Sequence, residues 1–474
     1  MYNHSEFFCA PTVSKKALNR FYSNFKAHED ELHVFAVYEN GAMLVRSASE
    51  PYRTTDKREV YSLSKSFCST AIGLLIDEGK LSEDDRIIDL FPDLCPEVIS
   101  ENLASMRLRH VMSMNCGHDD CVMPAMEWAE NAAKAFLAQP VPYVPGTHFA
   151  YNTGATCLLS CIVQRKSGVS LLDYLTPRLF QPLGITDVKW NRTADGTCEG
   201  GIGLHICIDD IIKLGTLYLQ NGIWGGKRIL SEHWVKAASS PVSDNSSNGS
   251  IDWCSGYGYQ FWVNARDGFR GDGACGQLCI VLPKYNTVVA VQGCIGDMQH
   301  EMDEIFRLVE HIHDDDGDEN VPVLLPNYIP EPSPTRLTGH EGTLYCLEKN
   351  SFGQNSLSFS FDTENNALRL IFSDGSRRQI LSAGSGKYME STVTIPYFKP
   401  KLCDIMRSDA AEECRVACTY AVNGDELDIQ IRHLTCPNPI PMKITFAEDT
   451  LTITFDEYCG MHESVLKVVG TAMQ

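Results

Sequence analysis

The chain has 474 residues and a formal net charge of −21 at pH 7. A single hydrophobic core rarely grows beyond about 250–300 residues, so this length predicts two domains, each large enough to bury a core. The negative charge argues against nucleic acids and anionic membrane surfaces as partners.

The N-terminus and the cysteines indicate the compartment. Residues 1–6 contain neither a basic segment nor a sustained apolar run, so we expect no signal peptide. We also find no run of about 18 apolar residues, the length that a membrane helix needs. The 19 cysteines are odd in number and scattered along a long chain. This pattern favours reduced thiols over a disulfide framework, and we expect a cytoplasmic protein.

Three elements are predicted before residue 50. Residues 14–28 have the pattern of an amphipathic helix, and strands are expected at residues 33–38 and 42–46. Asn40-Gly41 between the two strands is a strong hairpin signal. We expect these strands to belong to a sheet that precedes the next helix.

That next helix carries Ser62 and Lys65, three residues apart. Residues at this spacing lie on one helical face, with their Cβ atoms about 5–6 Å apart. If the helix begins near Ser62, the Lys65 ammonium can reach the Ser62 hydroxyl, which places a nucleophile beside a base. Gly79 suits the position just beyond the helix end.

Lys65 can act as a base only if its pKa falls from about 10.4 toward neutrality, and burial lowers the pKa of an amine. A hydroxyl in the first helical turn also lies near free backbone N–H groups, which favour an oxyanion. Apolar residues follow on the same helix and favour burial of the amine: Phe67, Ala71, Ile72, Leu74, Leu75 and Ile76.

The S-x-x-K motif alone is weak, because serine is common at helix N-termini as a cap. The sequence from roughly residue 30 to 315, however, resembles the serine β-lactamase and penicillin-binding-protein superfamily, in particular the class C β-lactamase-related hydrolases and esterases. The resemblance implies an α/β (α+β) β-lactamase-like fold, in which helices flank an antiparallel sheet and a helical subdomain borders a cleft.

The resemblance also places Tyr151 and Thr153 in the site, with Thr153 at the position usually held by asparagine. Tyr151, as a phenolate or a neutral phenol, would relay the proton between Ser62 and the leaving group. Two structural alternatives stay open. Tyr151 also fits a core tyrosine at a helix entrance, and Thr153 also fits the N-cap of the following helix.

Residues 269–277 correspond to the third motif of the superfamily, which reads basic residue, any residue, glycine. The resemblance implies that Asp272, Gly273 and Ala274 contact the substrate. The backbone N–H groups of Ala274 and Ser62 would form the oxyanion hole.

Gly271 occupies the basic position of this motif, so the cation that helps to hold a substrate carboxylate in the superfamily is missing. Side chains alternate along a strand, so Arg270 is expected on the side of Asp272 and not of Gly271. The Asp272 carboxylate would repel an anionic substrate. We therefore expect neutral or cationic esters and amides, including small peptides with free amines.

Other polar groups offer weaker signals. Gly200–Gly203 predicts a close backbone approach near the cleft, and His205 beside it is interpreted as a buried core residue. No metal and no cofactor are predicted: the acidic run 314–319 lacks calcium-loop spacing and is interpreted as a solvated linker. Three cysteine pairs at i,i+4 lack the second ligand pair of a zinc site, namely Cys157/Cys161, Cys275/Cys279 and Cys414/Cys418.

The last third of the chain has a different sequence pattern, in which polar and apolar residues alternate. Residues 1–320 are predicted as the hydrolase domain, 321–335 as a proline-bearing linker, and 336–474 as an all-β domain, a small sandwich or barrel. The alternating runs that predict its strands are 356–361, 367–372, 427–432, 444–446 and 451–455. No catalytic constellation is found in this region.

The predicted function is that of a serine hydrolase acting through an acyl-enzyme on an ester or amide of a small molecule or peptide. A hydrolase with a nucleophile elbow is disfavoured because the chain contains no G-x-S-x-G. A non-catalytic ligand sensor on the same fold is the alternative, because sites can decay on a retained fold. The sequence does not fix the acyl group or the oligomeric state.

Overall fold

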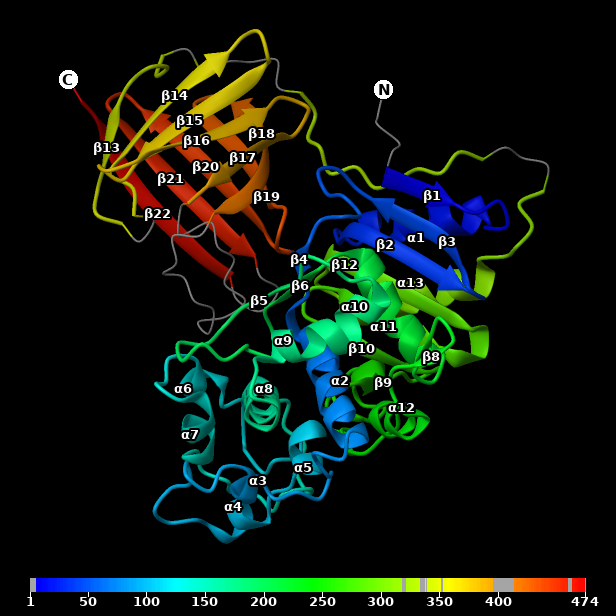
Figure 1. Cartoon of the computed structure of the whole chain (residues 1–474). Coiled ribbons are helices and arrows are strands. Elements are labelled where there is room, and N and C mark those ends of the chain that lie inside the picture. Colours follow the sequence, from blue (N-terminus) through cyan, green and yellow to red (C-terminus); the bar gives the residue numbers. More distant parts are fainter. Residues whose placement is uncertain are drawn as a thin grey trace. The chain divides into compact units, whose positions relative to one another are not determined.

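The computed structural model describes residues 6–317, 321–332, 337, 339–350, 353–394, 413–458 and 463–473. The chain divides into two compact units (Figure 1). The first comprises Met1–Ala48 and Lys57–Leu325, and the second comprises Ser49–Asp56 and Pro326–Gln474. The segment Ser49–Asp56 therefore belongs to the second unit, which the sequence patterns did not indicate.

The first unit is built on a seven-stranded antiparallel sheet in the order β1-β3-β2-β12-β11-β10-β9. The predicted hairpin is present, and Asn40 and Gly41 have φ angles of 50° and 87°, as its tight turn requires. The strands are β1 (Phe7–Cys9), β2 (Glu31–Glu39), β3 (Ala42–Ala48), β9 (Trp262–Val263), β10 (Phe269–Gly273), β11 (Gln277–Leu282) and β12 (Thr287–Cys294).

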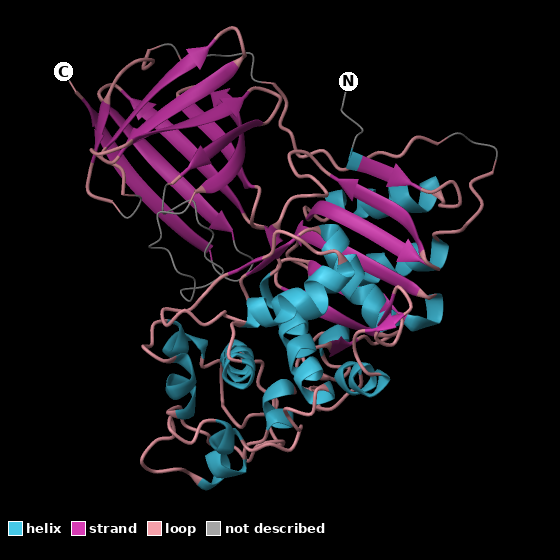
Figure 2. Ribbon diagram, in the orientation of Figure 1, coloured by secondary structure: helices cyan, strands magenta, loops and turns pink. Residues whose placement is uncertain are grey.

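Helices cover both faces of this sheet (Figure 2). On one face, α1 (Lys15–Ala27) and α13 (Met298–His311) share a core with the apolar side chains Leu278 and Ile280 of β11. On the other face lies α11 (Ile208–Leu219), whose Ile211 carbonyl accepts a hydrogen bond from Cys279 Sγ. Successive side chains of β11 thus point to opposite faces of the sheet, and the core of the unit lies in two layers, one on each face.

The helical subdomain surrounds two buried helices, α2 (Ser64–Asp77) and α8 (Thr153–Ser167), which pack against each other. Gly79 follows α2 with φ of 70°, as expected for its C-terminus. The other helices of the unit are α3 (Ile87–Leu90), α4 (Glu101–Ser105), α5 (Leu108–Met112), α6 (Met123–Glu127), α7 (Ala132–Leu137), α9 (Leu171–Leu175), α10 (Gln181–Leu183) and α12 (Glu232–Ser239).

Two small sheets complete the first unit. The larger has three strands in the order β4-β6-β5, and the smaller is a two-stranded ribbon of β7 and β8. Their strands are β4 (Arg58–Glu59), β5 (Lys189–Trp190), β6 (Leu204–Ile206), β7 (Ile223–Trp224) and β8 (Lys227–Arg228).

The second unit is an all-β body, as predicted. Its ten strands follow the order β16-β15-β14-β13-β22-β21-β20-β19-β18-β17, and a further parallel pairing of β16 with β18 closes the sheet into a barrel. The strands are β13 (Tyr345–Leu347), β14 (Ser356–Asp362), β15 (Ala367–Ser373), β16 (Arg378–Gly384), β17 (Met389–Val393), β18 (Cys414–Asn423), β19 (Glu426–His433), β20 (Pro439–Ala447), β21 (Thr450–Tyr458) and β22 (Glu463–Ala472).

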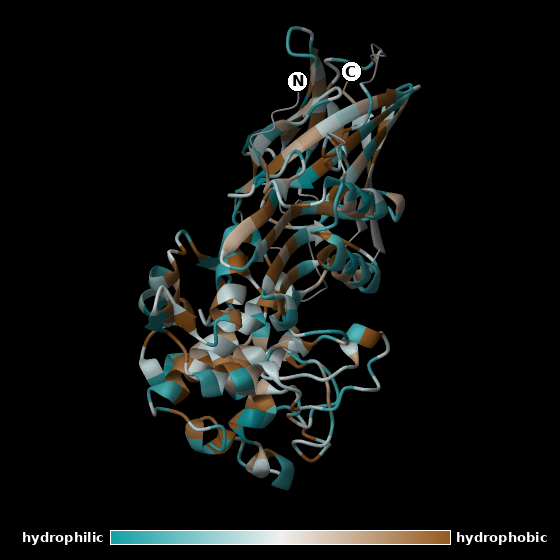
Figure 3. Ribbon diagram, turned by 90° about the vertical axis from the view of Figure 1, so that its right-hand side faces the viewer, coloured by the Kyte–Doolittle hydropathy of each residue, from teal (hydrophilic) through white to brown (hydrophobic). Residues whose placement is uncertain are grey.

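Apolar residues concentrate in the strands and central helices of the chain, and polar residues in the loops (Figure 3). Within the described ranges, no helix combines the length and the apolar character that crossing a bilayer requires.

The acidic run after α13 is not simply a solvated linker. Asp316 accepts hydrogen bonds from Ser14 Oγ at 2.6 Å and from the backbone N–H of Lys15 at 2.6 Å. Ser14 is the N-cap of α1, and its Oγ also accepts from the Ala17 N–H at 3.1 Å. The first turn of α1 has free N–H groups that favour an anion, and Asp316 supplies one.

We predict that Ser14→Ala lowers the free energy of unfolding by about 1 kcal/mol, because the substitution removes the N-cap of α1. Chemical denaturation followed by circular dichroism measures this difference. Ser247→Ala, at an exposed serine in a surface loop, is the control and should leave stability unchanged. An equal stability of the two variants would show that the cap contributes nothing.

Candidate active site

Ser62 lies in a single turn of 3-10 helix, Tyr61–Leu63, immediately before α2. The α-helix therefore begins at Ser64, slightly later than the sequence predicts. Tyr61, directly before the serine, is fully buried and has φ of 45°, a conformation that is uncommon for a bulky side chain. The surrounding packing thus holds the Ser62 turn in one geometry, while Ser62 itself remains partly exposed.

Lys65 lies in the first turn of α2 and is only 1% exposed. Its Nζ is 2.9 Å from Ser62 Oγ, 3.1 Å from Thr153 Oγ1 and 2.8 Å from the carbonyl oxygen of Gly201. The structure therefore brings the serine and the amine together at the expected spacing. The approach of Gly201 agrees with the close backbone contact predicted for the glycine-rich loop.

Burial lowers the pKa of Lys65 from 10.5 to about 7. The neighbouring Cys121, Cys68 and Asp272 act in the opposite direction but do not cancel the effect of burial. Near neutral pH a substantial fraction of the amine is therefore uncharged and can accept the Ser62 proton.

The Tyr151 phenol lies close enough to Ser62 for that hydroxyl to lower its pKa, and its ring centroid is 4.9 Å from Lys65 Nζ. Trp262 stacks on the Tyr151 ring at a centroid distance of 5.3 Å. Burial is the largest influence on the phenol and raises its pKa above the ordinary value of 10. Tyr151 is therefore a neutral phenol that can donate a proton.

Thr153 is the first residue of α8, and its hydroxyl contacts Lys65. The N-cap of α8 is Asn152, whose side chain accepts a hydrogen bond from the Ala155 N–H. The alternative interpretation of Thr153 as the N-cap is therefore wrong. Its hydroxyl instead helps to fix the amine beside Ser62.

The end of β10 lies directly against the turn that carries the serine. A Cβ atom at Gly273 would be 2.3 Å from the Val60 carbonyl oxygen and 3.1 Å from the Leu63 nitrogen. Any side chain at this position would displace the turn. Ala274 follows and is partly exposed, which is the position expected for a backbone donor beside Ser62.

Arg270 and Asp272 lie on the same side of β10, as the alternation of side chains predicts. Arg270 is fully buried, and its Nε donates to Asp272 Oδ2 at 2.9 Å. Its Nη1 donates to Asn264 Oδ1 at 3.0 Å, and the guanidinium stacks on Trp253. The Asp272 charge is therefore balanced by a partner, which removes the premise that Asp272 alone repels anionic substrates.

Sequence reasoning missed two residues of the loop before α6. Cys121 lies close enough to influence the pKa values of Lys65 and Tyr151. His118 is 2% exposed, and burial lowers its pKa to about 4, so its imidazole is neutral. Neither residue belongs to a motif, because they reach the site through tertiary packing.

The tautomer of His118 follows from its neighbours. Asn152 Oδ1 accepts from the N–H groups of Val122 and Ala155, so the Asn152 Nδ2 group faces His118 Nδ1, at 3.3 Å. His118 Nδ1 is therefore the acceptor and Nε2 carries the hydrogen. Nε2 has almost no accessible surface and no hydrogen-bond partner in the described part of the chain, so a ligand acceptor reaches this N–H only after a shift of the loop.

This loop lines a cavity of about 460 Å³. Two carboxylates, Asp119 and Asp120, stand at its wall beside His118 and Cys121. The wall of the cavity therefore carries two negative charges and the neutral imidazole of His118. Cys121, which lies near Lys65, belongs to the same wall. The remaining lining residues are Val122, Pro124, Ala125, Gln139, Pro140 and Pro142.

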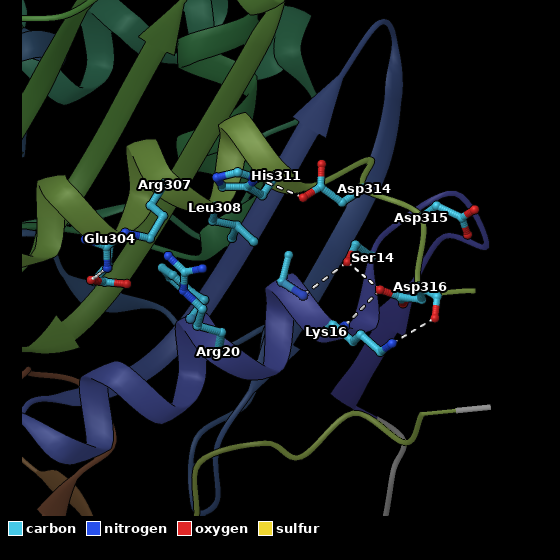
Figure 4. Close-up of a pocket in the computed structure, with 12 residues that line it drawn as sticks. Ser14, Lys16, Arg20, Glu304, Arg307, Leu308, His311, Asp314, Asp315 and Asp316 are labelled. Carbon is cyan, nitrogen blue, oxygen red and sulfur yellow. Dashed lines mark hydrogen bonds and ion pairs between the residues drawn. The ribbon is translucent and has the colours of Figure 1, made fainter. Parts of the chain in front are cut away.

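A second cavity, of about 270 Å³, lies between α1 and α13 (Figure 4). Its polar groups contact one another: Lys16 Nζ donates to the backbone carbonyl of Asp316, and His311 Nδ1 lies 2.8 Å from Asp314 Oδ2. None of the predicted site residues lines it. His205, interpreted as structural, lies in β6 opposite Glu59 of β4 and Lys189 of β5.

The comparisons with known proteins agree with this geometry. A family model described as Beta-lactamase matches residues 26–292. A 6-aminohexanoate-dimer hydrolase of Paenarthrobacter ureafaciens is 24% identical over 280 residues, which is 54% of this chain and 70% of that protein. A D-aminopeptidase of Brucella anthropi is 25% identical over 130 residues, 27% of this chain and 25% of that protein.

Structural similarity extends further along the chain than sequence similarity. The crystal structure of SurE with D-Leu has a TM-score of 0.52 and 17% identity, and the match covers 95% of this chain and 98% of that chain. At this identity the match indicates a shared fold, and it includes residues of both units.

We predict that the rate of acylation of Ser62 by an activated ester rises with pH, with a midpoint at about 7. Lys65 accepts a proton only in its neutral form, and an amine is neutral above its pKa, so the rate increases through that pH. Stopped-flow acylation rates between pH 5 and 9 measure the profile. A midpoint close to the ordinary lysine value would contradict the assignment of Lys65 as the base.

Proposed function

Because this chain belongs to the beta-lactamase family, we propose that it is a serine hydrolase that cleaves an ester or amide through an acyl-enzyme on Ser62. The observation that carries the proposal is the buried amine of Lys65, 2.9 Å from Ser62 Oγ with a pKa lowered to about 7. An uncharged amine at this distance serves no purpose in stabilising the helix, but it is what a base requires.

The proposed reaction begins when Ser62 Oγ attacks the substrate carbonyl carbon and its proton passes to neutral Lys65. The backbone N–H groups of Ser62 and Ala274 stabilise the oxyanion. Tyr151 then donates its phenol proton to the leaving alcohol or amine and recovers a proton from the Lys65 ammonium. Water, deprotonated along the same route, attacks the acyl-enzyme and releases the acid and free Ser62.

The proposed substrate is neutral or cationic. The named relatives act on a 6-aminohexanoate dimer and as a D-aminopeptidase. In this chain, Asp119 and Asp120 at the wall of the cavity favour a positive group. The buried His118 Nε2–H lies behind them, and a shift of the loop would let it donate to a carbonyl oxygen of the same substrate. Asp272 contributes little to this preference because Arg270 neutralises it.

A non-catalytic sensor is the second candidate, and the departure that supports it is Gly271 in place of a cation. The other departure, Thr153 in place of asparagine, has less weight, because its hydroxyl contacts Lys65. Covalent labelling distinguishes the two functions, since a sensor retains the fold without an activated serine.

We also propose a reducing, cytoplasmic environment. Each cysteine in the described part of the chain is a free thiol. A chain rich in thiols that form no disulfides suits a reducing compartment.

We predict that a fluorophosphonate or an activated ester adds once to the wild-type chain, and that Ser62→Ala abolishes this adduct. Lys65→Ala should lower the rate of acylation about as severely as Ser62→Ala, by roughly 10³-fold or more, because residues that act as one unit show non-additive losses. Intact-mass spectrometry and stopped-flow kinetics measure both effects.

Lys284→Ala, at an exposed lysine remote from Ser62 in sequence and outside the site contacts, is the matched control and should react as the wild type does. An unlabelled wild type across several probes would favour the sensor. Rapid labelling of Lys65→Ala would refute the proposed base.

We predict that Asp119→Asn and Asp120→Asn each reduce kcat/KM for an ester that bears a free amine relative to its uncharged analogue. Each substitution removes a carboxylate that attracts the ammonium, a change of at most about 1 kcal/mol or about fivefold, because both carboxylates are exposed. Glu310→Gln, on α13 and exposed, makes the same change in net charge away from the cavity. An identical charge preference in all of these variants would exclude the cavity as the amine subsite.

A further inference from the structure

Three potential metal ligands from distant parts of the sequence converge at one end of the sheet. His28 is the C-cap residue of α1, Asp30 immediately precedes β2, and His300 lies in the first turn of α13. One ligand atom from each residue lies within 4.8 Å of the others. This cluster contains none of the residues assigned to the active site.

The distances are close to those around a tetrahedral cation. Asp30 Oδ2 lies 3.8 Å from His28 Nδ1 and 3.6 Å from His300 Nδ1. Ligand bonds of about 2.0–2.1 Å place neighbouring ligand atoms about 3.3–3.4 Å apart in a tetrahedral site. The two histidine ligand atoms lie within 4.8 Å of each other, so coordination requires the rings to turn toward one point between them.

Direct hydrogen bonding does not explain this arrangement. Both histidine nitrogens are too far from Asp30 Oδ2 for a hydrogen bond. The two imidazole rings stack at a centroid distance of 3.9 Å with an interplanar angle of 15°. An imidazole binds a metal ion in its own ring plane, so binding of one ion by both rings requires the half-exposed His28 ring to rotate out of this stack.

Two of the three ligand atoms are buried without a partner. Asp30 is only 5% exposed, and its Oδ2 has no hydrogen-bond partner among the described residues. The same is true of His300 Nδ1. Burying unpaired polar atoms is costly, and a bound cation would satisfy both at once.

Neighbouring groups support the ligands in the way that metal sites require. The Gly296 N–H donates to Asp30 Oδ1 at 2.9 Å, which leaves Oδ2 for the cation. His300 Nε2 faces Glu304 Oε1, one turn further along α13, at 3.8 Å, which is too long for a hydrogen bond, so the imidazole must turn slightly for this carboxylate to orient it. Asn24 Nδ2 of α1 donates to Glu304 Oε2 at 2.7 Å. Glu304 is also visible beside Arg307 in Figure 4.

We propose that His28, Asp30 and His300 bind a divalent transition-metal ion of the zinc type. Two imidazole nitrogens and one carboxylate oxygen suit Zn²⁺, Co²⁺ or Ni²⁺ better than Ca²⁺ or Mg²⁺, which prefer all-oxygen ligands. His28 is about half exposed, so water has access to the fourth position. The ion joins α1, β2 and α13 and thereby stabilises the fold of the first unit.

The test uses the full chain, stripped of metal with a chelator and then titrated with Co²⁺ and Zn²⁺. Calorimetry gives stoichiometry and affinity, and the visible spectrum of Co²⁺ distinguishes nitrogen and oxygen ligands from thiolates. The wild type should bind one ion that His300→Ala and Asp30→Asn bind at least about tenfold more weakly. Zn²⁺ should raise the Tm of the wild type, because it binds the folded state.

His28→Ala keeps the test decisive if the substitutions at the two more buried ligands prevent folding, because this half-exposed side chain contributes little to the core. Its Tm should not respond to Zn²⁺. His233→Ala, at a histidine that is 80% exposed on α12, is the matched control and should bind as the wild type does. Equal affinity and an equal rise in Tm in the wild type and His28→Ala would overturn the proposal and assign the binding to cysteines.

Discussion

The burial of one amine is the constraint on which the catalytic geometry depends. Lys65 lies in the interior of the first unit, where its Nζ forms hydrogen bonds with Ser62, Thr153 and the Gly201 carbonyl. Removal from water makes its ammonium form unfavourable and the neutral form accessible near pH 7. Each of these three contacts comes from a different element, so the Ser62 turn, α8 and the glycine-rich loop must all be in place before the amine is activated.

Much of the fold follows from local sequence signals. The hairpin at Asn40-Gly41, helix α1 and the strands β11 and β12 could be predicted because turn chemistry and periodicity act over a few residues. The short strand β1 was missed because pairing with a longer neighbour, and not an intrinsic pattern, defines it. A strand was expected to begin within residues 256–262, and β9 begins at Trp262. In the second unit, alternation predicted an all-β body, but the closure of its sheet depends on the contact of β16 with β18.

The site could be predicted in part for the same reason. Ser62 lies in the turn that leads directly into the first turn of α2, where Lys65 lies, so their spacing in the sequence brings them together. Tyr151 and Thr153 required a resemblance, because only tertiary packing carries them to the serine. His118 lies outside any motif, and the His28–Asp30–His300 cluster joins residues that are about 270 positions apart. The Arg270–Asp272 pair shows why the effect of one charge cannot be predicted alone. The buried Asp272 carboxylate has Arg270 as its partner, and the guanidinium balances its negative charge.

The packing of β10 against the Ser62 turn bears on how this chain could diverge. At Gly271 a Cβ atom would be 2.4 Å from Leu63 Cδ1 and 2.7 Å from Ser66 Oγ. The basic residue of the superfamily motif would therefore clash with the nucleophile turn and helix at this position. A cation at position 271 requires Leu63 and Ser66 to move or change with it. The three positions are thus coupled, and the effect of a substitution at one of them depends on the residues at the other two.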